Sequence, residues 1–390
     1  MNRVRGAQRG GAEPARIGLN AQLLSLSASY RGAGIAHYIH QLLVHLPKVS
    51  DREYVAFVGD RGFRAEGMDT VCSRLPTHNP LARILWEQTI LPAESARRRI
   101  RLLHAMAFVS PVLSHLPTVV TVYDVSFALF PESFRPFNRG YLTTMTRRTA
   151  RRADAVIAIS RSTADDLQRL WGIPQARIHL AYPGVDAEFR PLSASDVEAF
   201  RAAKGLPSRY VLFVGTLEPR KNVTRLVEAF AVLKQQGLPH KLVLAGGKGW
   251  MYEPIFAAVE NLGLQGDVIF PGFVSRQELP LWYNGAALFA YPSLYEGFGL
   301  GPLEAMACGT PVVVSNRASL PEVVGDAGIQ VDAEDAAGLA EAMASVLTSP
   351  SRAAQMRERG MERAARFTWE QTARDTARTY EIVLSEQPDV

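Results

Sequence analysis

Residues 291–311 read YPSLYEGFGLGPLEAMACGTP, and this stretch decides the fold of the second half of the chain. A strand-like run over 287–292 leads into a glycine-rich turn, and a short helix follows the turn. Proline favours the first helical position, and glycine favours the position after the last one. We therefore expect a helix of about two turns that begins at Pro302, carries Glu304 in its first turn and stops at Gly309.

The turn combines flexible backbone with two carboxylates, Glu296 and Glu304. Gly297, Gly299 and Gly301 let a ligand approach the backbone closely, and the free N–H groups at a helix start bind anions. A carboxylate beside an anion site is favourable where it holds an uncharged part of the same ligand, and it can accept two hydrogen bonds from a vicinal diol. Phosphate next to sugar hydroxyls indicates a nucleotide sugar.

Strand-like and helix-like segments alternate through both halves of the chain. Strands are predicted at 16–21, 54–59, 118–123, 155–160, 211–215, 241–247, 267–270, 287–292 and 311–315. Helices are predicted at 34–46, 138–152, 162–171 and 369–386, the last opened by a capping box of Thr368 and Gln371. This alternation predicts an α/β fold with two doubly wound, Rossmann-like domains that face each other across a cleft.

The length of 390 residues is too great for one ordinary hydrophobic core. Turn residues concentrate at 185–208, which predicts a domain boundary in that region. We expect a disordered tail at 1–15, a first domain at 16–190, a second domain at 191–368 and a final helical segment at 369–390.

The composition, with 47% hydrophobic and 21% charged residues, is that of a soluble globular protein. No apolar run is long enough to span a bilayer, and the first 16 residues lack the apolar centre of a signal peptide. A cytoplasmic location is therefore expected. Cys72 and Cys308 are too few and too far apart in sequence to predict a disulfide framework or a metal site.

Positive charge is concentrated in the first half of the chain. Residues 1–190 hold 25 Lys and Arg against 15 Asp and Glu, and the surplus centres on RRRIR (97–101) and RRTARR (147–152). Such patches attract phosphates, so contact of Arg97–Arg101 and Arg147–Arg152 with an anionic membrane surface is one interpretation, and a solvated helix face is the other. Nucleic acid is not expected as a partner, because the sequence shows no recognised binding motif for it.

Five further segments resemble one enzyme family and follow that family's order. They are LWEQ (85–88), ADAVIAIS (153–160), YPGVD (182–186), GTLEPRKN (215–222) and SLPEVVGDAG (319–328). Together with the Glu-x7-Glu spacing of Glu296 and Glu304, they resemble family 4 of the retaining glycosyltransferases, which have the GT-B architecture. The resemblance covers roughly residues 16–380 and implies that the last helix crosses back onto the first domain.

The resemblance gives the two glutamates different roles. Glu296 would face the donor sugar and support positive charge at its anomeric carbon, and Glu304 would hold the ribose hydroxyls. The alternative for Glu304 is a contact with the helix dipole. Backbone contacts to the donor sugar and its phosphates are implied for Gly297, Phe298, Gly299 and Leu300.

Two cations follow the strand predicted at 211–215. Lys221 and Arg220 would bind the diphosphate, whose charge rises as the glycosidic bond breaks. The alternative for these cations is an ion pair with Glu218 or a contact with the helix start. Thr216 stands where many relatives carry arginine and would contribute a single hydrogen bond.

The loop at 30–37 is partly similar to a dinucleotide fingerprint. Gly32 and Gly34 fit it, but His37 stands where the third glycine belongs, so we reject NAD binding. The resemblance instead places Gly34 against the donor phosphates. It leaves the role of His37 open, because relatives often have arginine there.

Asp124 ends a predicted strand and faces the cleft in this topology. It would orient hydroxyl groups of the sugar or the acceptor, or else cap the loop that follows. The neighbouring Tyr123 replaces a histidine that in many relatives contacts the donor sugar, which leaves that contact open. The catalytic residues implied by the resemblance are Asp124, Lys221 and Glu296.

Neither a metal nor another cofactor is expected. Asp165 and Asp166 lack Asp-x-Asp spacing, and the eight histidines show no His-x3-His pair. No residue fits a covalent nucleophile, so the resemblance implies a front-face mechanism in which the leaving phosphate accepts the proton of the acceptor.

The segment combination is most similar to bacterial α-mannosyltransferases of polysaccharide assembly. This favours GDP-mannose as donor, with UDP-glucose as the runner-up, and a lipid-linked oligosaccharide as acceptor at the inner membrane face. The alternatives are a nucleotide-sugar epimerase, a phosphorylase and a non-catalytic subunit that binds sugar nucleotides. A phosphorylase would need a pyridoxal phosphate lysine and a far longer chain.

Overall fold

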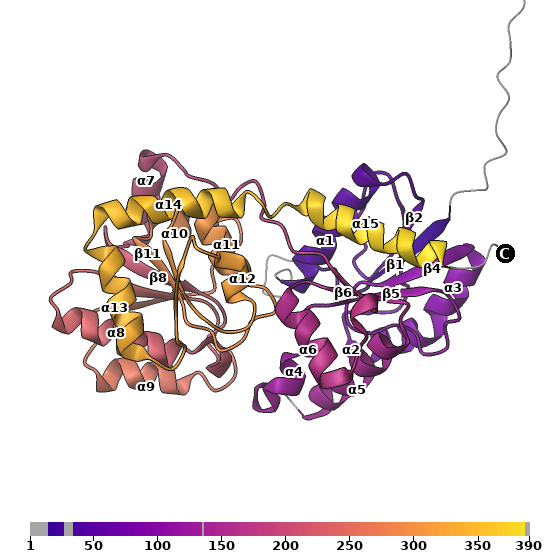
Figure 1. Cartoon of the computed structure of the whole chain (residues 1–390), viewed down its shortest axis with the longest axis horizontal. Coiled ribbons are helices and arrows are strands. Elements are labelled where there is room, and N and C mark those ends of the chain that lie inside the picture. The colour runs from indigo at the N-terminus through magenta and orange to yellow at the C-terminus, as the bar shows by residue number, and fades with distance from the viewer. Residues whose placement is uncertain (1–14, 27–33, 135, 387–390) are drawn as a thin grey trace, which may run out of the picture.

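The computed structural model describes residues 15–26, 34–134 and 136–386. Of the predicted tail at 1–15, only Ala15 belongs to the described residues. Gly32 and the last four residues of the segment predicted at 369–390 also lie outside them. The described residues form two α/β domains that lie side by side (Figure 1).

A parallel sheet with the strand order β3-β2-β1-β4-β5-β6-β7 forms the centre of the first domain. The strands are β1 (Arg16–Ala21), β2 (Tyr54–Val58), β3 (Asp69–Cys72), β4 (Ile100–Ala105), β5 (Thr118–Val122), β6 (Ala155–Ala158) and β7 (Ile178–Leu180). The apolar strands β2 and β5 are buried along their whole length, as expected where helices cover both faces of a sheet. The four strands predicted in this half are confirmed to within two residues, whereas β3, β4 and β7 were not predicted.

Helices cover both faces of this sheet (Figure 1). They are α1 (Ile35–Val49), α2 (Pro80–Leu85), the π-helix η2 (Trp86–Ile90), α3 (Leu91–Arg97), α4 (Ser126–Leu129), the 3-10 turns η3 (Pro131–Ser133) and η4 (Gln175–Arg177), α5 (Pro136–Arg152) and α6 (Arg161–Trp171). Ser160 caps α6 by accepting a hydrogen bond from the N–H of Thr163, at 3.0 Å.

The second domain has a parallel sheet with the order β10-β9-β8-β11-β12-β13. Its strands are β8 (Tyr210–Val214), β9 (Lys241–Ala245), β10 (Val268–Gly272), β11 (Leu288–Tyr291), β12 (Val312–Ser315) and β13 (Ile329–Val331), of which β13 was not predicted. Its helices are α7 (Ala194–Lys204), η5 (Pro219–Lys221), α8 (Val223–Gln235), α9 (Glu253–Asn261), α10 (Leu279–Gly285), α11 (Leu300–Ala307), α12 (Leu320–Val324) and α13 (Ala336–Leu347). In Figure 1, α8, α9 and α13 lie on one face of the sheet, and α7, α10 and α11 lie on the other.

Two C-terminal helices join the domains. Helix α14 (Pro350–Ala364) packs on α11 of the second domain, and α15 (Trp369–Ser385) packs on α1 of the first domain (Figure 1). Thr368 caps α15 by accepting from the N–H of Gln371, at 3.2 Å, which forms half of the predicted capping box. The prediction that the final helix crosses back onto the first domain is confirmed, as is the doubly wound α/β fold.

Candidate functional site

The short helix after the glycine-rich turn is α11, and it begins at Leu300 rather than at Pro302. Gly299 adopts a φ of +117°, which glycine tolerates, and so turns the chain directly into the helix. Pro302 is then the third helical residue, where a missing N–H costs no intrahelical hydrogen bond. The prediction that Glu304 lies in the first turn is therefore wrong, and Glu304 lies in the second turn.

The turn before α11 presents backbone N–H groups. Within the described residues, no backbone carbonyl accepts a hydrogen bond from the N–H groups of Gly297, Phe298 or Gly299. The hydroxyl of Ser319 donates to the carbonyls of Glu296 and Phe298, at 2.9 and 2.5 Å, and fixes the turn from its carbonyl side. The three residues are buried, and anion binding at their N–H groups stays a prediction of the sequence.

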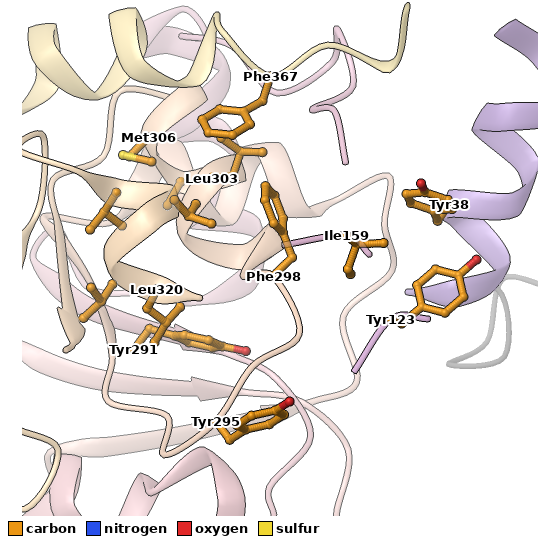
Figure 2. Packing of buried hydrophobic residues seen from close by; sticks show 14 of the residues in the cluster. Tyr38, Tyr123, Ile159, Tyr291, Tyr295, Phe298, Leu303, Met306, Leu320 and Phe367 are labelled. Atoms are coloured by element: carbon orange, nitrogen blue, oxygen red, sulfur yellow. The ribbon is translucent and has the colours of Figure 1, made fainter. Parts of the chain in front are cut away.

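The side chain of Phe298 belongs to the hydrophobic core. Its ring lies 5.7 Å from that of Phe367 and 5.9 Å from that of Tyr182, and Figure 2 shows Phe367 beside it. A ligand can therefore meet the backbone of Phe298 but not its side chain.

Lys221, Glu296 and Tyr291 form one buried polar cluster. The Nζ of Lys221 donates to Oε1 of Glu296 at 2.6 Å and to the hydroxyl of Tyr291 at 2.8 Å. Arg220 lies beside this cluster, with Nη1 3.5 Å from Oε2 of Glu296. It also donates to Glu218 Oε1 at 2.7 Å, so the predicted alternative of an ion pair with Glu218 is present as well.

Electrostatic interactions within this cluster determine the charges of Glu296 and Lys221. Burial alone would raise the pKa of Glu296, but the positive charges of Lys221 and Arg220 lower it to about 2. Burial works against the charge of Lys221, yet the carboxylate of Glu296 raises the pKa of this lysine. Glu296 is thus a carboxylate and Lys221 an ammonium at neutral pH. The ammonium has three N–H groups, and the two bonds above leave one for a further acceptor.

Glu304 of α11 belongs to a second polar cluster. Its Oε1 accepts from Arg276 Nη1 at 3.1 Å, and its Oε2 accepts from the hydroxyl of Tyr283 at 3.0 Å. Burial raises the pKa of Glu304, and the charge of Arg276 opposes this increase. The ion pair with Arg276 replaces the helix-dipole contact that the sequence allowed.

Asp186 continues this cluster into the first domain. This buried carboxylate accepts hydrogen bonds from Arg276 Nε at 3.2 Å, Gln41 Nε2 at 3.0 Å and Trp369 Nε1 at 2.6 Å. His37 Nε2 lies 3.0 Å from Asp186 Oδ1, which accounts for the histidine whose role the sequence left open. Sequence reasoning missed Asp186 and Arg276, although YPGVD was quoted for the resemblance and 272–276 follows a predicted strand.

Tyr123 and Asp124 at the end of β5 point in different directions. The hydroxyl of Tyr123 donates to the carbonyl of Met106 at 2.8 Å, and its ring packs on Tyr38 at 5.2 Å in the core of the first domain (Figure 2). The side chain of Tyr123 therefore points into the core of the first domain. Asp124 is half-buried, and its Oδ1 accepts from the N–H and the hydroxyl of Ser126 at 2.9 and 2.7 Å, which is the predicted loop-capping alternative.

The two domains touch at the turn before α11. A Cβ added to Gly297 would lie 2.3 Å from the carbonyl oxygen of Tyr123 and 3.0 Å from Cβ of Asp124, so only glycine fits this approach. Nearby, the hydroxyl of Tyr295 in the second domain donates to Asp166 of α6 at 2.9 Å. The structure thus brings Asp124 next to Gly297. Asp124 also interacts electrostatically with Arg220. Burial works against the charge of Arg220, but the carboxylates of Glu296, Glu218 and Asp124 together raise the pKa of this arginine.

Gly34, Thr216 and Leu300 are the remaining residues predicted to contact the donor. Gly34 is exposed at the start of α1 with a φ of +56°, and no heavy atom lies within 4 Å of the place where a Cβ would stand. Thr216 is exposed after β8. Leu300, at the first position of α11, is half-buried.

Among the described residues, no three His, Cys, Asp or Glu side chains are grouped as a metal ion would require. The same part of the chain has no helix with the length and apolarity that crossing a membrane demands.

Comparisons with known proteins identify the family of the chain. The family model described as "Glycosyl transferases group 1" matches residues 196–363, and the model described as "Glycosyltransferase Family 4" matches residues 32–189. The chain is similar to the O-antigen chain mannosyltransferase B of Escherichia coli, with 32% identity over 68% of this chain and 70% of that protein. It is also similar to the serotype-specific mannosyltransferase WbdA of Escherichia coli, with 34% identity over 57% of this chain but only 28% of WbdA.

Among solved structures, the chain resembles a sucrose-phosphate synthase from Thermosynechococcus elongatus. The TM-score is 0.76 with 22% identity, and the superposition covers 96% of this chain and 100% of that one. At this identity the likeness shows the fold. The matched family models, the mannosyltransferase relative and the two Rossmann-like domains together show that the chain belongs to glycosyltransferase family 4, with the GT-B fold.

Proposed function

We propose that this glycosyltransferase moves mannose from GDP-mannose onto a hydroxyl of a lipid-linked saccharide, with retention of configuration and without a metal ion. The observation that carries the proposal is the buried pair of Lys221 and Glu296, followed in the chain by Gly297–Gly299, whose N–H groups have no backbone acceptor among the described residues. The mannosyl donor is favoured because two relatives that the chain resembles are mannosyltransferases.

The site supports a donor that lies along α11. The diphosphate would accept hydrogen bonds from the remaining N–H of Lys221, from Arg220 and from the amides before the helix. Gly34 and Thr216 would lie at the edge of the diphosphate. The ribose hydroxyls would meet Glu304 in the second turn of the helix. Glu296 would then lie near the hexose, where its fixed negative charge favours the oxocarbenium-like transition state.

A front-face reaction suits the charge state of Glu296. The carboxylate is held by Lys221 at 2.6 Å, and its lowered pKa makes it a poor proton acceptor. In the proposed step the bond from the anomeric carbon to the phosphate oxygen breaks, and the bond to the acceptor oxygen forms on the same face. The acceptor proton passes to the leaving phosphate, and Asp124 would orient the acceptor hydroxyl.

Nucleotide binding and product release test this proposal. A ligand that binds only the folded protein stabilises it by about 2.7 kcal/mol at a hundredfold excess over its Kd. We expect a clear rise in Tm with GDP, a smaller rise with UDP and none with ADP. GDP should be released from GDP-mannose when a hydroxyl acceptor is present, which an epimerase or a non-catalytic subunit would not do. A strong rise in Tm with UDP and none with GDP would indicate that UDP-glucose, not GDP-mannose, is the donor.

We further propose that the first domain contacts an anionic membrane, where a lipid-linked acceptor would lie. Arg147, Arg148, Arg151 and Arg152 are exposed on α5 around a hollow of about 410 Å³. Phe137, at the start of the same helix, is 69% exposed. By contrast, Arg97 and Arg98 in the other basic cluster pair with Glu94 at 3.0 and 3.3 Å, so α5 is the stronger candidate.

Charge reversal on α5 should weaken membrane binding. Each basic residue near an anionic surface contributes about 1 kcal/mol, so a double variant of Arg147→Glu and Arg151→Glu should bind anionic vesicles at least about tenfold more weakly. Vesicle sedimentation with and without phosphatidylserine measures the effect. The matched control reverses Arg352 and Arg359, which are exposed on α14 of the second domain. If both double variants bound anionic vesicles equally well, the arginines of α5 would be explained as a solvated helix face.

A further inference from the structure

Arginines line a cavity of about 440 Å³ at the amino ends of β1 and β4 in the first domain. β1 begins at Arg16 and β4 at Ile100, and these two strands pair in parallel. Pockets that hold small ligands measure about 300–1,000 Å³, so the cavity has the size of a ligand site. The residues that line it are Ala15, Arg16, Glu53, Arg97, Arg98, Arg99 and Arg101.

The cavity lies away from the edge of the sheet where the reaction is proposed. In sheets of this type the reacting ligands lie beyond the carboxyl ends of the strands, whereas this cavity lies at the amino ends. The strand β1 has 6 residues, which separates the two edges by about 20 Å. In Figure 1, α3 and β4 lie on the side of the first domain that faces away from the second domain. A ligand in this cavity would therefore be neither the donor nor the acceptor.

Three of the lining arginines pair with carboxylates. Glu53 Oε2 accepts a hydrogen bond from Arg16 Nη2 at 2.7 Å. Glu94 Oε2 accepts from Arg97 Nη2 at 3.0 Å and from Arg98 Nε at 3.3 Å. The lining itself contributes a single carboxylate, that of Glu53.

The other two lining arginines, Arg99 and Arg101, have no such partner. Both are exposed, and within residues 15–26, 34–134 and 136–386 neither guanidinium group has a hydrogen-bond or ion-pair partner. Several guanidinium groups around a small cavity repel one another, because salt screens charges only beyond about 8 Å at physiological ionic strength. A bound anion would relieve this repulsion.

The backbone of Arg99 also indicates that its side chain has a role. Helix α3 ends at Arg97, Arg98 is its C-cap, and Arg99 follows with a φ of +55°. Glycine is favoured at this position, because a residue with a Cβ is strained in the left-handed conformation. Strain of this kind is common where a side chain binds a ligand. A favourable contact with the helix dipole does not require Arg99, since Arg97 already lies in the last turn.

The chemistry of the lining selects the ligand. Guanidinium groups bind phosphate through paired, charge-assisted hydrogen bonds. The lining has no aromatic side chain on which a nucleobase would stack. Its only apolar residue is Ala15, so it offers no side chain to insert into a bilayer, in contrast to the exposed Phe137 of α5. These properties favour a compact, soluble phosphate compound over a nucleic acid or a membrane.

We infer that this cavity binds a soluble ligand with two or more phosphate groups, at a site separate from the reaction. Arg99 and Arg101 hold the phosphate groups, and the three paired arginines add positive charge around them. Such a ligand is an effector of the first domain and not a reactant. The inference does not depend on which sugar nucleotide is the donor.

The test titrates tripolyphosphate into the full-length protein at physiological ionic strength, with isothermal calorimetry as the measurement. The wild type should bind it, and the double variant of Arg99→Gly and Arg101→Gln should bind at least about tenfold more weakly, because charge-assisted hydrogen bonds are lost. The matched control, Arg352→Gln with Arg359→Gln on α14, removes the same charge from an exposed surface and should bind like the wild type. The proposed donor site would also take phosphates, so the titrations are repeated on Lys221→Met, which should keep the binding that the cavity variant loses.

Stability separates a binding role from a structural one. Arg99→Gly alone should keep or raise the Tm, because glycine tolerates the φ of +55°, and yet it should weaken tripolyphosphate binding. Tripolyphosphate should also raise the Tm of the wild type.

Three results would overturn the inference. The first is a wild type that does not bind tripolyphosphate, and the second is a cavity double variant that binds it as tightly as the wild type or no more weakly than the α14 control. The third is a cavity double variant that loses binding to phosphatidylglycerol vesicles but keeps tripolyphosphate binding, which would assign the arginines to a membrane surface.

Discussion

Replacing Lys221 by Met should lower turnover by about two to three orders of magnitude, the loss typical of removing one group that stabilises charge in a transition state. The variant removes a cation proposed to bind the diphosphate and also removes the ion-pair partner of Glu296, whose carboxylate keeps Arg220 at 3.5 Å. Glu296→Gln should cause a loss of the same order, because it removes the negative charge near the anomeric carbon. The measurement is the initial rate of nucleoside diphosphate release at saturating donor.

The double variant of Lys221→Met and Glu296→Gln should lose less than the product of the two single losses. The side chains are in direct contact, and residues that act as a pair are not additive. Lys204→Met is the control, because Lys204 pairs with Glu278 at the surface, 2.7 Å away, and should keep full activity. Full turnover in the Lys221 and Glu296 variants would contradict their catalytic roles.

Replacing Asp186 by Ala should destabilise the protein by about 3–5 kcal/mol, the cost of removing one partner from a buried ion pair. The variant leaves Arg276, His37 and the indole N–H of Trp369 without their shared acceptor. These groups come from both domains and from α15, so the loss should also loosen the contact between the domains. A decrease in Tm measures the effect, since a two-domain chain is not expected to unfold in one step.

The neighbouring Glu188→Ala provides the control. Glu188 is exposed and lies 3.9 Å from Arg276 Nε, so its loss should change the Tm very little. If Asp186→Ala and Glu188→Ala lowered the Tm equally, the Asp186 cluster would not join the domains as described.

The sequence predicts strands such as β2, β5, β8 and β11 because these strands are nearly continuous apolar runs. It does not predict β4, since Ile100–Ala105 begins inside the RRRIR cluster and its second residue, Arg101, is charged. It also fails for β3, β7 and β13, which have four, three and three residues and are too short to show a period. Glycine and proline rules located α11 but misplaced its start, because the φ of +117° at Gly299 is not visible in the sequence.

The family resemblance placed Lys221, Arg220 and Glu296 at one site, and both segments follow strands on the same edge of one sheet. The ion pair between Lys221 and Glu296 was not predicted. The Asp186 cluster could not be predicted in the same way. Its members lie at 37, 41, 186, 276 and 369, and only the packing of two domains and a crossing helix brings them together. Tyr123 shows the opposite case, where a residue that aligns with a ligand contact in relatives turns into the core instead.

The central claim is that the donor diphosphate lies between Lys221 and the amides that precede α11. A crystal structure with GDP-mannose, or with an analogue that cannot react, tests it most directly. We expect a phosphate oxygen within hydrogen-bond distance of Lys221 Nζ, another at the N–H groups of residues 297–300, and the ribose at Glu304. A diphosphate bound away from these groups, for example among the arginines of α5, would contradict the claim.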